Sequence, residues 1–84
     1  MQNINSIEDI FDRVQVIFQV VLEDNDIVLR NETTSNDIPE WDSLNHISLV
    51  VNIEKQFKIQ FTAKEIQDFK NVGEMCQGIF EKIK

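Results

Sequence analysis

The sequence predicts an all-α fold, a bundle of three longer helices and one short helix with a long loop between the first two. Apolar residues recur at spacings of three and four along most of the chain, and capping residues precede several of these runs. Only two Gly and one Pro occur in 84 residues, fewer than an all-β fold with many turns needs. A chain of this length makes one small domain, residues 1–84, with little room for an enclosed active site.

The first helix is expected to begin after Ser6 and to end near Glu23. Ser6 with Asp9 resembles a capping box in which Asp replaces the usual Glu. Asp24-Asn25-Asp26 supplies turn-forming side chains beyond the helix. The apolar residues trace one helical face: Ile7, Ile10, Phe11, Val14, Ile17, Phe18, Val21 and Leu22.

Residues 24–42 show no sustained periodicity and are expected to form a loop. Thr33 to Asp37 are loop-forming residues, and Ile38 precedes Pro39, which disfavours helical angles. A loop this long in a compact domain is usually functional. Its apolar residues are expected to anchor it across the bundle: Ile27, Val28, Leu29, Ile38 and Trp41.

The second helix is predicted from Ser43 to about Phe57, and its apolar arc is unusually broad. At 100° per residue, one stripe contains His46, Leu49, Val50, Ile53 and Phe57. A second stripe contains Leu44, Ile47 and Val51. Either the helix is central and contacts neighbours on two sides, or its second stripe awaits a partner.

Two further helices are expected in the last third of the chain. Thr62-Ala63-Lys64-Glu65 is a capping box and predicts a brief helix with Ile66 and Phe69 facing inward. Residues Asn71 to Glu74 form a similar capping box at the start of the last helix. The predicted core face of this helix consists of Val72, Met75, Cys76, Ile79, Phe80 and Ile83. Gly78 is expected at a close helix contact. Lys82 and Lys84 are expected in the last turn, where positive charge suits the helix dipole.

Charge and composition exclude several functions. The net charge is −7, with ten acidic and two basic residues in 1–42 against five acidic and six basic in 43–84. We expect no nucleic-acid binding, because the first half repels phosphates and the second offers no basic stripe. The most apolar run, residues 14–22, is too short to cross a membrane.

Cysteine and histidine usage indicates a reduced, cytoplasmic protein without a metal site. Cys76 has no partner for an internal disulfide, and no secretory leader is apparent. Its place on a core face predicts inert packing rather than reactivity. One His and one Cys cannot make a metal site.

Asp42-Ser43-Leu44 places a primary alcohol where the loop becomes the second helix. A serine there can also act as a simple N-cap. At this point the chain resembles the acyl carrier protein family, whose signature is Asp-Ser-Leu at the head of the second helix. The resemblance continues through the Glu54 to Phe57 end of that helix, the Phe61-Thr62 start of the third segment and Val72 at the last helix. It implies the four-helix acyl carrier bundle.

By this resemblance, Ser43 carries a 4'-phosphopantetheine arm whose thiol holds acyl groups as thioesters. A separate phosphopantetheinyl transferase supplies the arm from coenzyme A with the help of a metal ion, and Asp42 resembles the family's acidic recognition residue for that enzyme. The chain is then a carrier and not an enzyme. For Asp42, the alternative is a carboxylate that only complements the helix dipole.

The resemblance also assigns a docking surface and a cargo pocket. Leu44, Ile47 and Val51, together with Glu54, correspond to positions that meet partner enzymes. His46 is expected as a half-buried ring near the arm rather than as a catalytic base. If the bundle shelters cargo, the expected lining is Leu49, Val50, Ile53, Phe61, Ile66 and Phe69, and the alternative is a closed core.

One departure favours a specialised stand-alone carrier over a housekeeping one. Residues 44–57 contain only Glu54 and Lys55 as charged residues, and Ser48 and Lys55 stand where the family pattern has acids. We expect a monomer that serves acyl-activating, acyl-transferring or condensing enzymes of fatty-acid, polyketide or related biosynthesis. The alternatives are a D-alanyl or other aminoacyl carrier and, from another class, an unmodified acidic helical adaptor.

Overall fold

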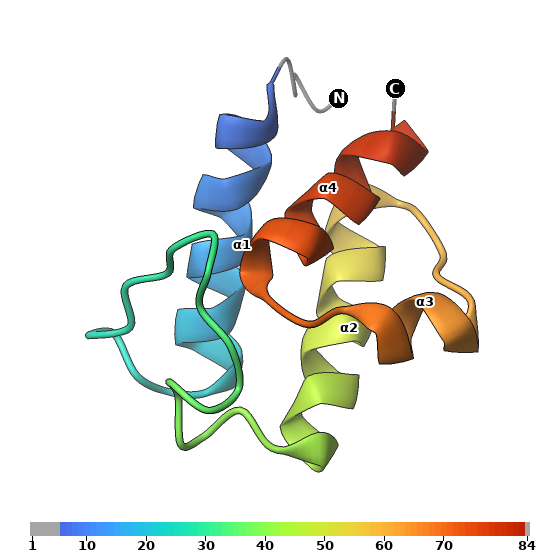
Figure 1. Cartoon of the computed structure of the whole chain (residues 1–84). Helices are drawn as coiled ribbons and strands as arrows, with labels where there is room; N and C mark the ends of the chain where they lie inside the picture. Colours follow the sequence, from blue (N-terminus) through green and yellow to red (C-terminus); the bar gives the residue numbers. More distant parts are fainter. Residues whose placement is uncertain (1–5, 84) are drawn as a thin grey trace.

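The structure, a computed structural model, describes residues 6–83, and this part contains four α-helices and no strand (Figure 1). They are α1 (Ile7–Val21), α2 (Ser43–Phe57), α3 (Ala63–Asp68) and α4 (Val72–Ile83). In Figure 1, α1 and α2 run in opposite directions and α4 crosses in front of α2. The extensive helix contacts are those of α1 with α2 and with α4. The predicted all-α bundle and its long first loop are confirmed.

The helices begin where the capping residues predict. Ser6 Oγ accepts a hydrogen bond from Asp9 N (3.3 Å) at the start of α1, and Asn71 Oδ1 accepts one from Glu74 N (2.8 Å) at the start of α4. Helix α1 ends at Val21, two residues before the expected end. Lys82 lies in the last turn of α4, whereas Lys84 lies outside the described residues.

Helix α3 has the complete capping box that its sequence predicts. Thr62 Oγ1 accepts from Glu65 N (3.1 Å), and Glu65 Oε1 accepts from Thr62 N (2.8 Å). The hydrogen bond from the Thr62 backbone, with a smaller effect of Lys82, lowers the pKa of Glu65 below its usual value. Both halves of the box therefore fix the start of a six-residue helix that has no buried residue of its own.

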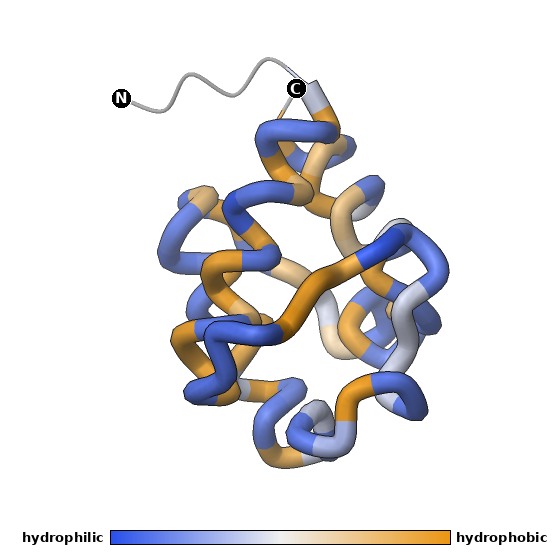
Figure 2. Tube along the Cα trace, turned by 90° about the vertical axis from the view of Figure 1, so that its left-hand side faces the viewer, coloured by the Kyte–Doolittle hydropathy of each residue, from blue (hydrophilic) through white to orange (hydrophobic). Residues whose placement is uncertain are grey.

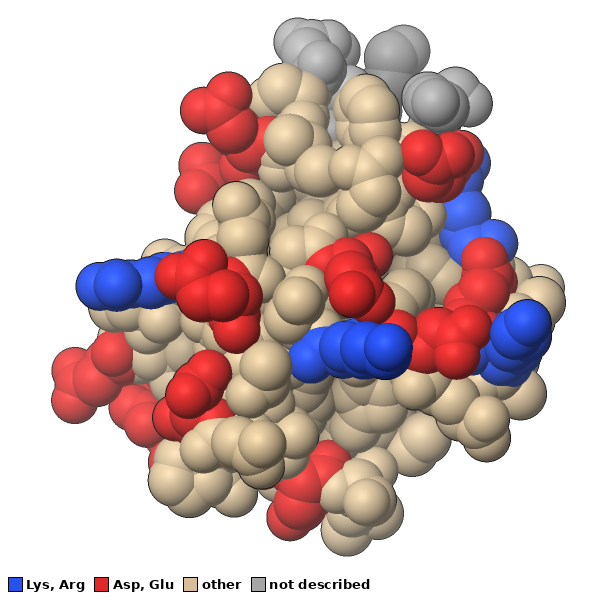
Figure 3. All heavy atoms as spheres, viewed as in Figure 1, with Lys and Arg blue, Asp and Glu red and all other residues tan. Residues whose placement is uncertain are grey.

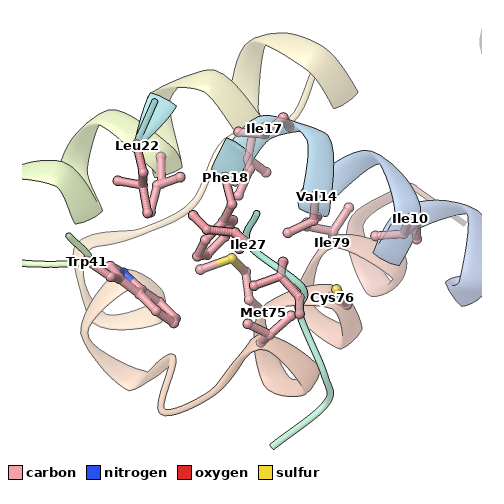
Figure 4. Packing of buried hydrophobic residues seen from close by; sticks show 14 of the residues in the cluster. Ile10, Val14, Ile17, Phe18, Leu22, Ile27, Trp41, Met75, Cys76 and Ile79 are labelled. Carbon is pink, nitrogen blue, oxygen red and sulfur yellow. The ribbon is translucent and has the colours of Figure 1, made fainter. Parts of the chain in front are cut away.

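The core lies between α1, α2, α4 and the inner side of the loop. Figure 4 shows side chains of α1, the loop and α4 meeting, and the Phe18 and Trp41 rings pack edge to face with centroids 4.9 Å apart. Figure 2 shows hydrophobic and hydrophilic positions alternating along the helices, as expected for helices with one buried face. The buried set includes Ile10, Val14, Phe18, Leu49, Ile53, Val72, Met75, Cys76 and Ile79.

The loop is anchored by four of the five apolar residues expected to anchor it. Ile27, Leu29, Ile38 and Trp41 are buried, but Val28 is 72% exposed. The expectation for Val28 is wrong because successive side chains of an extended segment point to opposite sides, so two buried neighbours turn the residue between them outward.

Hydrogen bonds connect the loop to α1 on one side and α4 on the other. Gln15 Oε1 accepts from Leu29 N (2.9 Å), and Gln19 Nε2 donates to Ile27 O (3.0 Å). The loop carbonyls of Thr33 and Asn31 accept from Val72 N and Gly73 N, both at 2.9 Å. The loop thus supplies acceptors for two amides at the N-terminus of α4, which a helix cannot satisfy internally.

Candidate functional site

Asp42, and not Ser43, is the N-cap of α2. Asp42 has an extended backbone, and its Oδ1 accepts from Asn45 N at 2.8 Å. Ser43 is the first helical residue, and it is exposed. The alternative that Ser43 is the N-cap is therefore wrong, because a cap needs an extended backbone to bring its side chain back over the first turn. The serine hydroxyl is left for other chemistry.

The chain that leads into Ser43 is fixed by short-range hydrogen bonds. Asn45 Nδ2 donates to Glu40 O at 2.7 Å, and Asp42 N donates to the same carbonyl at 3.0 Å. Trp41 N donates to Ile38 O at 3.0 Å. The buried Trp41 side chain fixes the chain before Ser43, and the hydrogen bonds of Asn45 fix the chain after it. Ser43 itself faces solvent.

His46 joins the head of α2 to Trp41 and to α3. Trp41 Nε1 donates to His46 Nδ1 at 3.0 Å, and His46 Nε2 lies 3.2 Å from Ile66 O. The indole N–H can only donate, so Nδ1 is the acceptor and Nε2 is the ring nitrogen that can donate to Ile66 O. Both ring nitrogens are thus engaged, and neither is free to take a proton from Ser43. His46 is half-buried, as expected.

A recess of about 400 Å³ opens beside Ser43, between the head of α2 and α3. Ile66 and Phe69 are the only two of the six expected cargo-pocket residues that line it. Leu49, Val50 and Ile53 are buried in the bundle, and Phe61 packs edge to face on Phe69. The recess is lined by Ser35, Trp41, Asp42, Ser43, His46, Ile66, Gln67, Phe69 and Lys70.

Sequence reasoning missed Ser35, Gln67 and Lys70 as recess residues. All three are polar: Ser35 lies in the loop before α2, Gln67 on α3 and Lys70 just after α3, so no apolar periodicity marks them. The pairing of Trp41 with His46, five residues apart, was the one available local signal, since an indole in the core needs an acceptor.

The second apolar stripe of α2 is exposed in the described part of the chain. Leu44 is 78% exposed, Ile47 53% and Val51 40%. Because all three side chains are exposed, the first of the two explanations for the broad arc, a central helix with neighbours on both sides, does not hold. The stripe begins one residue after Ser43.

The electrostatic environment is acidic without a metal cluster. On the face that Figure 3 shows, acidic side chains are scattered over the surface and basic ones are few. Residues 6–83 contain no group of three or more His, Cys, Asp or Glu that could bind a metal ion. Within the same residues, every helix is too short or too polar to cross a lipid bilayer.

Comparison with known proteins gives two findings. The family model described as "Phosphopantetheine attachment site" matches residues 12–79. The structure is also similar to the solution NMR structure of holo acyl carrier protein from Geobacter metallireducens, with a TM-score of 0.82 and 42% sequence identity. That match covers 87% of this chain and 84% of the other.

Proposed function

Because this chain belongs to the acyl carrier protein family and uses a 4'-phosphopantetheine prosthetic group, we propose that Ser43 is the residue that carries the group. The observation that carries the proposal is an exposed hydroxyl at the first position of α2, released from capping by Asp42. The family is a carrier family and does not itself catalyse a reaction.

The residues around Ser43 fit a phosphate ester. Asp42 Oδ1 engages Asn45 N and Asp42 O engages His46 N, whereas the amides of Ser43 and Leu44 come before the first intrahelical bond. Those amides and the positive end of the helix dipole favour a negative group on Ser43. When bound, the arm supplies a thiol that holds acyl groups as thioesters.

The proton of the Ser43 hydroxyl must be removed by a partner enzyme. His46 lies three residues after Ser43, but its two nitrogens are engaged with Trp41 and Ile66. A phosphopantetheinyl transferase that brings its own base and metal ion meets this requirement. Asp42 is exposed and uses one carboxylate oxygen as the cap, so its second oxygen is available to that enzyme as a recognition group.

Partner enzymes dock on Leu44, Ile47 and Val51 under this proposal, with Glu54 as a further recognition residue. The stripe offers exposed apolar surface next to the arm. Three exposed apolar side chains gathered on one helix face favour a protein partner. The partners are acyl-activating, acyl-transferring or condensing enzymes of a fatty-acid, polyketide or related pathway in the cytoplasm. The weakly charged second helix favours a specialised role over a housekeeping one.

Incubation of the apo chain with coenzyme A, Mg²⁺ and a broad-specificity phosphopantetheinyl transferase tests the attachment site. Intact mass should rise by one phosphopantetheinyl group in the natural chain and should not change in Ser43→Ala. Ser48→Ala is the matched control, since Ser48 is an exposed serine on the same helix, and it should be modified normally.

Two other outcomes would overturn the assignment. A mass increase that survives Ser43→Ala would move the attachment to another residue. An unchanged mass in the natural chain would favour the unmodified acidic adaptor, in which the apolar stripe of α2 alone binds the partner.

A further inference from the structure

Helix α3 is held against the bundle by few contacts. It has no buried residue, and its backbone contact with α2 is the hydrogen bond between His46 Nε2 and Ile66 O. A salt bridge joins Glu65 Oε1 to Lys82 Nζ on α4 at 3.1 Å. Phe69, just after α3, packs edge to face on Phe61 with centroids 5.0 Å apart. Any group that enters between α2 and α3 must therefore break or stretch the hydrogen bond between His46 Nε2 and Ile66 O.

His46 stands between the recess and the core. It lies on the same face of α2 as Leu49 and Ile53, which are fully buried and do not line the recess. Both His46 and Ile66 do line it, so their hydrogen bond borders the recess on the side where the core begins. Trp41 fixes the ring orientation because its N–H occupies Nδ1, which leaves Nε2 to donate to Ile66.

On the premise that the arm is attached to Ser43, we propose that His46 is a latch that keeps acyl cargo out of the bundle. The Trp41–His46–Ile66 chain of hydrogen bonds joins α2 to α3 at the border of the recess, so that a passage into the core stays closed and the cargo stays in the recess. His46 thereby determines the class of acyl group that this carrier shelters. The recess suits a short acyl group with polar substituents, since six of its nine lining residues are polar: Ser35, Asp42, Ser43, His46, Gln67 and Lys70.

Turning the His46 ring out of the way is unfavourable because it removes the acceptor of a buried indole N–H. Trp41 is 5% exposed, and its Nε1 has His46 Nδ1 as partner. A buried donor without a partner costs the full desolvation of that group. An apolar chain that entered would have to offset this loss together with the loss of the bond to Ile66.

The test compares the natural chain, His46→Ala and His46→Gln, each loaded on Ser43 with acetyl or octanoyl phosphopantetheine and checked by intact mass. Glutamine offers one acceptor and one donor, as the neutral His ring does, whereas alanine offers neither. Hydroxylamine cleavage of the thioester measures exposure of the cargo. Amide chemical shifts of Leu49 and Ile53 report entry into the core.

In the natural chain and in His46→Gln, octanoyl and acetyl thioesters should be cleaved at similar rates, and the Leu49 and Ile53 amides should have the same shifts with either cargo. In His46→Ala, octanoyl should be cleaved roughly tenfold more slowly than acetyl, because each methylene removed from water adds to its retention. The two amides should then shift only with the longer chain.

Protection of octanoyl in the natural chain would overturn the latch, and so would equal cleavage of the two thioesters in a folded His46→Ala variant. If His46→Ala does not fold, Trp41→Phe replaces it, since this change removes the donor to Nδ1 and keeps an aromatic ring in the core. Equal cleavage in that variant would then overturn the latch as well. A chain that is not modified at all would instead refute the attachment to Ser43, and with it this inference.

Discussion

The carboxylate of Glu54 on α2 accepts a hydrogen bond from the backbone N–H of Phe61, with 2.8 Å between Oε2 and N. The Glu54 carbonyl also accepts from Ile59 N at 3.1 Å, and Lys58 between them has a left-handed backbone with φ 57°. Glu54 therefore holds the turn that leads from α2 to Phe61 and α3. Glu54, which was expected only as a recognition residue, therefore also makes a hydrogen bond that supports the fold.

Glu54→Ala should lower the free energy of unfolding by about 1–3 kcal/mol, because the half-buried amide of Phe61 loses its acceptor. Glu54→Gln should lose much less, since an amide oxygen can accept the same bond. Urea unfolding followed by circular dichroism measures both. Equal losses in the two variants would show that the charge, and not the hydrogen bond, matters for stability.

Two substitutions of Asp42 distinguish the effect of its N-cap hydrogen bond from the effect of its negative charge. Asp42→Ala should lower the free energy of unfolding by about 1 kcal/mol through loss of the bond to Asn45 N. Asp42→Asn should retain that stability, because Asn is as good an N-cap as Asp. If the charge of Asp42 also guides the transferase, both variants should be modified more slowly, with kcat/KM measured by the rate of mass increase. Normal modification of Asp42→Asn would refute that role.

The exposed stripe of α2 should dominate docking. Ile47→Ala is expected to weaken binding to a partner enzyme by about 1 kcal/mol or more, because a central apolar side chain is lost from the interface. Val28→Ala, at an even more exposed valine on the loop, is the matched control and should bind normally. Surface plasmon resonance at two salt concentrations measures both. A steep loss with salt, with no effect of Ile47→Ala, would contradict docking by apolar contact.

The thiol of Cys76 should not react with thiol reagents under native conditions. Burial raises the pKa of this thiol to about 12, and its side chain is 1% exposed. Titration with a chromogenic disulfide at neutral pH should therefore find no reactive thiol in the apo chain and, under the proposed function, one thiol in the holo chain, that of the arm. In denaturant each form should gain one. A reactive thiol in the native apo chain would show that α4 opens readily.

The same raised pKa predicts how stability changes at alkaline pH. The unfolded chain releases the Cys76 proton near its ordinary pKa of 9.0, whereas the folded chain retains it to about 12. The stability contribution of the neutral thiol is thus complete below pH 9 and declines as pH rises toward 12. Cys76→Ala should unfold with a weaker pH dependence in that range, measured by urea unfolding at several pH values.

Two glycines of α4 should respond in opposite ways to alanine. A Cβ at Gly73 would lie 3.0 Å from the backbone oxygen of Asn31, so Gly73→Ala should push the loop from α4 and destabilise the fold by about 1–3 kcal/mol. A Cβ at Gly78 would meet side-chain atoms of the Phe69 ring at 3.1 Å and of the Phe61 ring at 3.8 Å, and Ala is better in a helix by about 1 kcal/mol. Gly78→Ala should therefore change stability little or raise it. Thermal unfolding distinguishes the two outcomes.

Periodicity and capping residues were sufficient to predict the helices, since α1, α2 and α4 each have one buried face and α3 has a complete capping box. The same features could not decide whether Asp42 or Ser43 caps α2, because both residue types are good caps and only the backbone angle of each distinguishes them. The recess could not be predicted either. It depends on Ile66 lying against His46, a contact between residues twenty apart in the chain. Val28 was misplaced because apolar character alone does not reveal the alternation of an extended segment.

The carbonyls of Asn31 and Thr33, which bind the first amides of α4, connect the loop that precedes Ser43 with a segment that is synthesised about forty residues later. The loop that delivers Asp42 and Ser43 to their place cannot complete its contacts until residues 72 and 73 have left the ribosome. We expect that a nascent chain lacking α4 would present a poorly ordered serine. Loading of the prosthetic group would then follow the synthesis of α4.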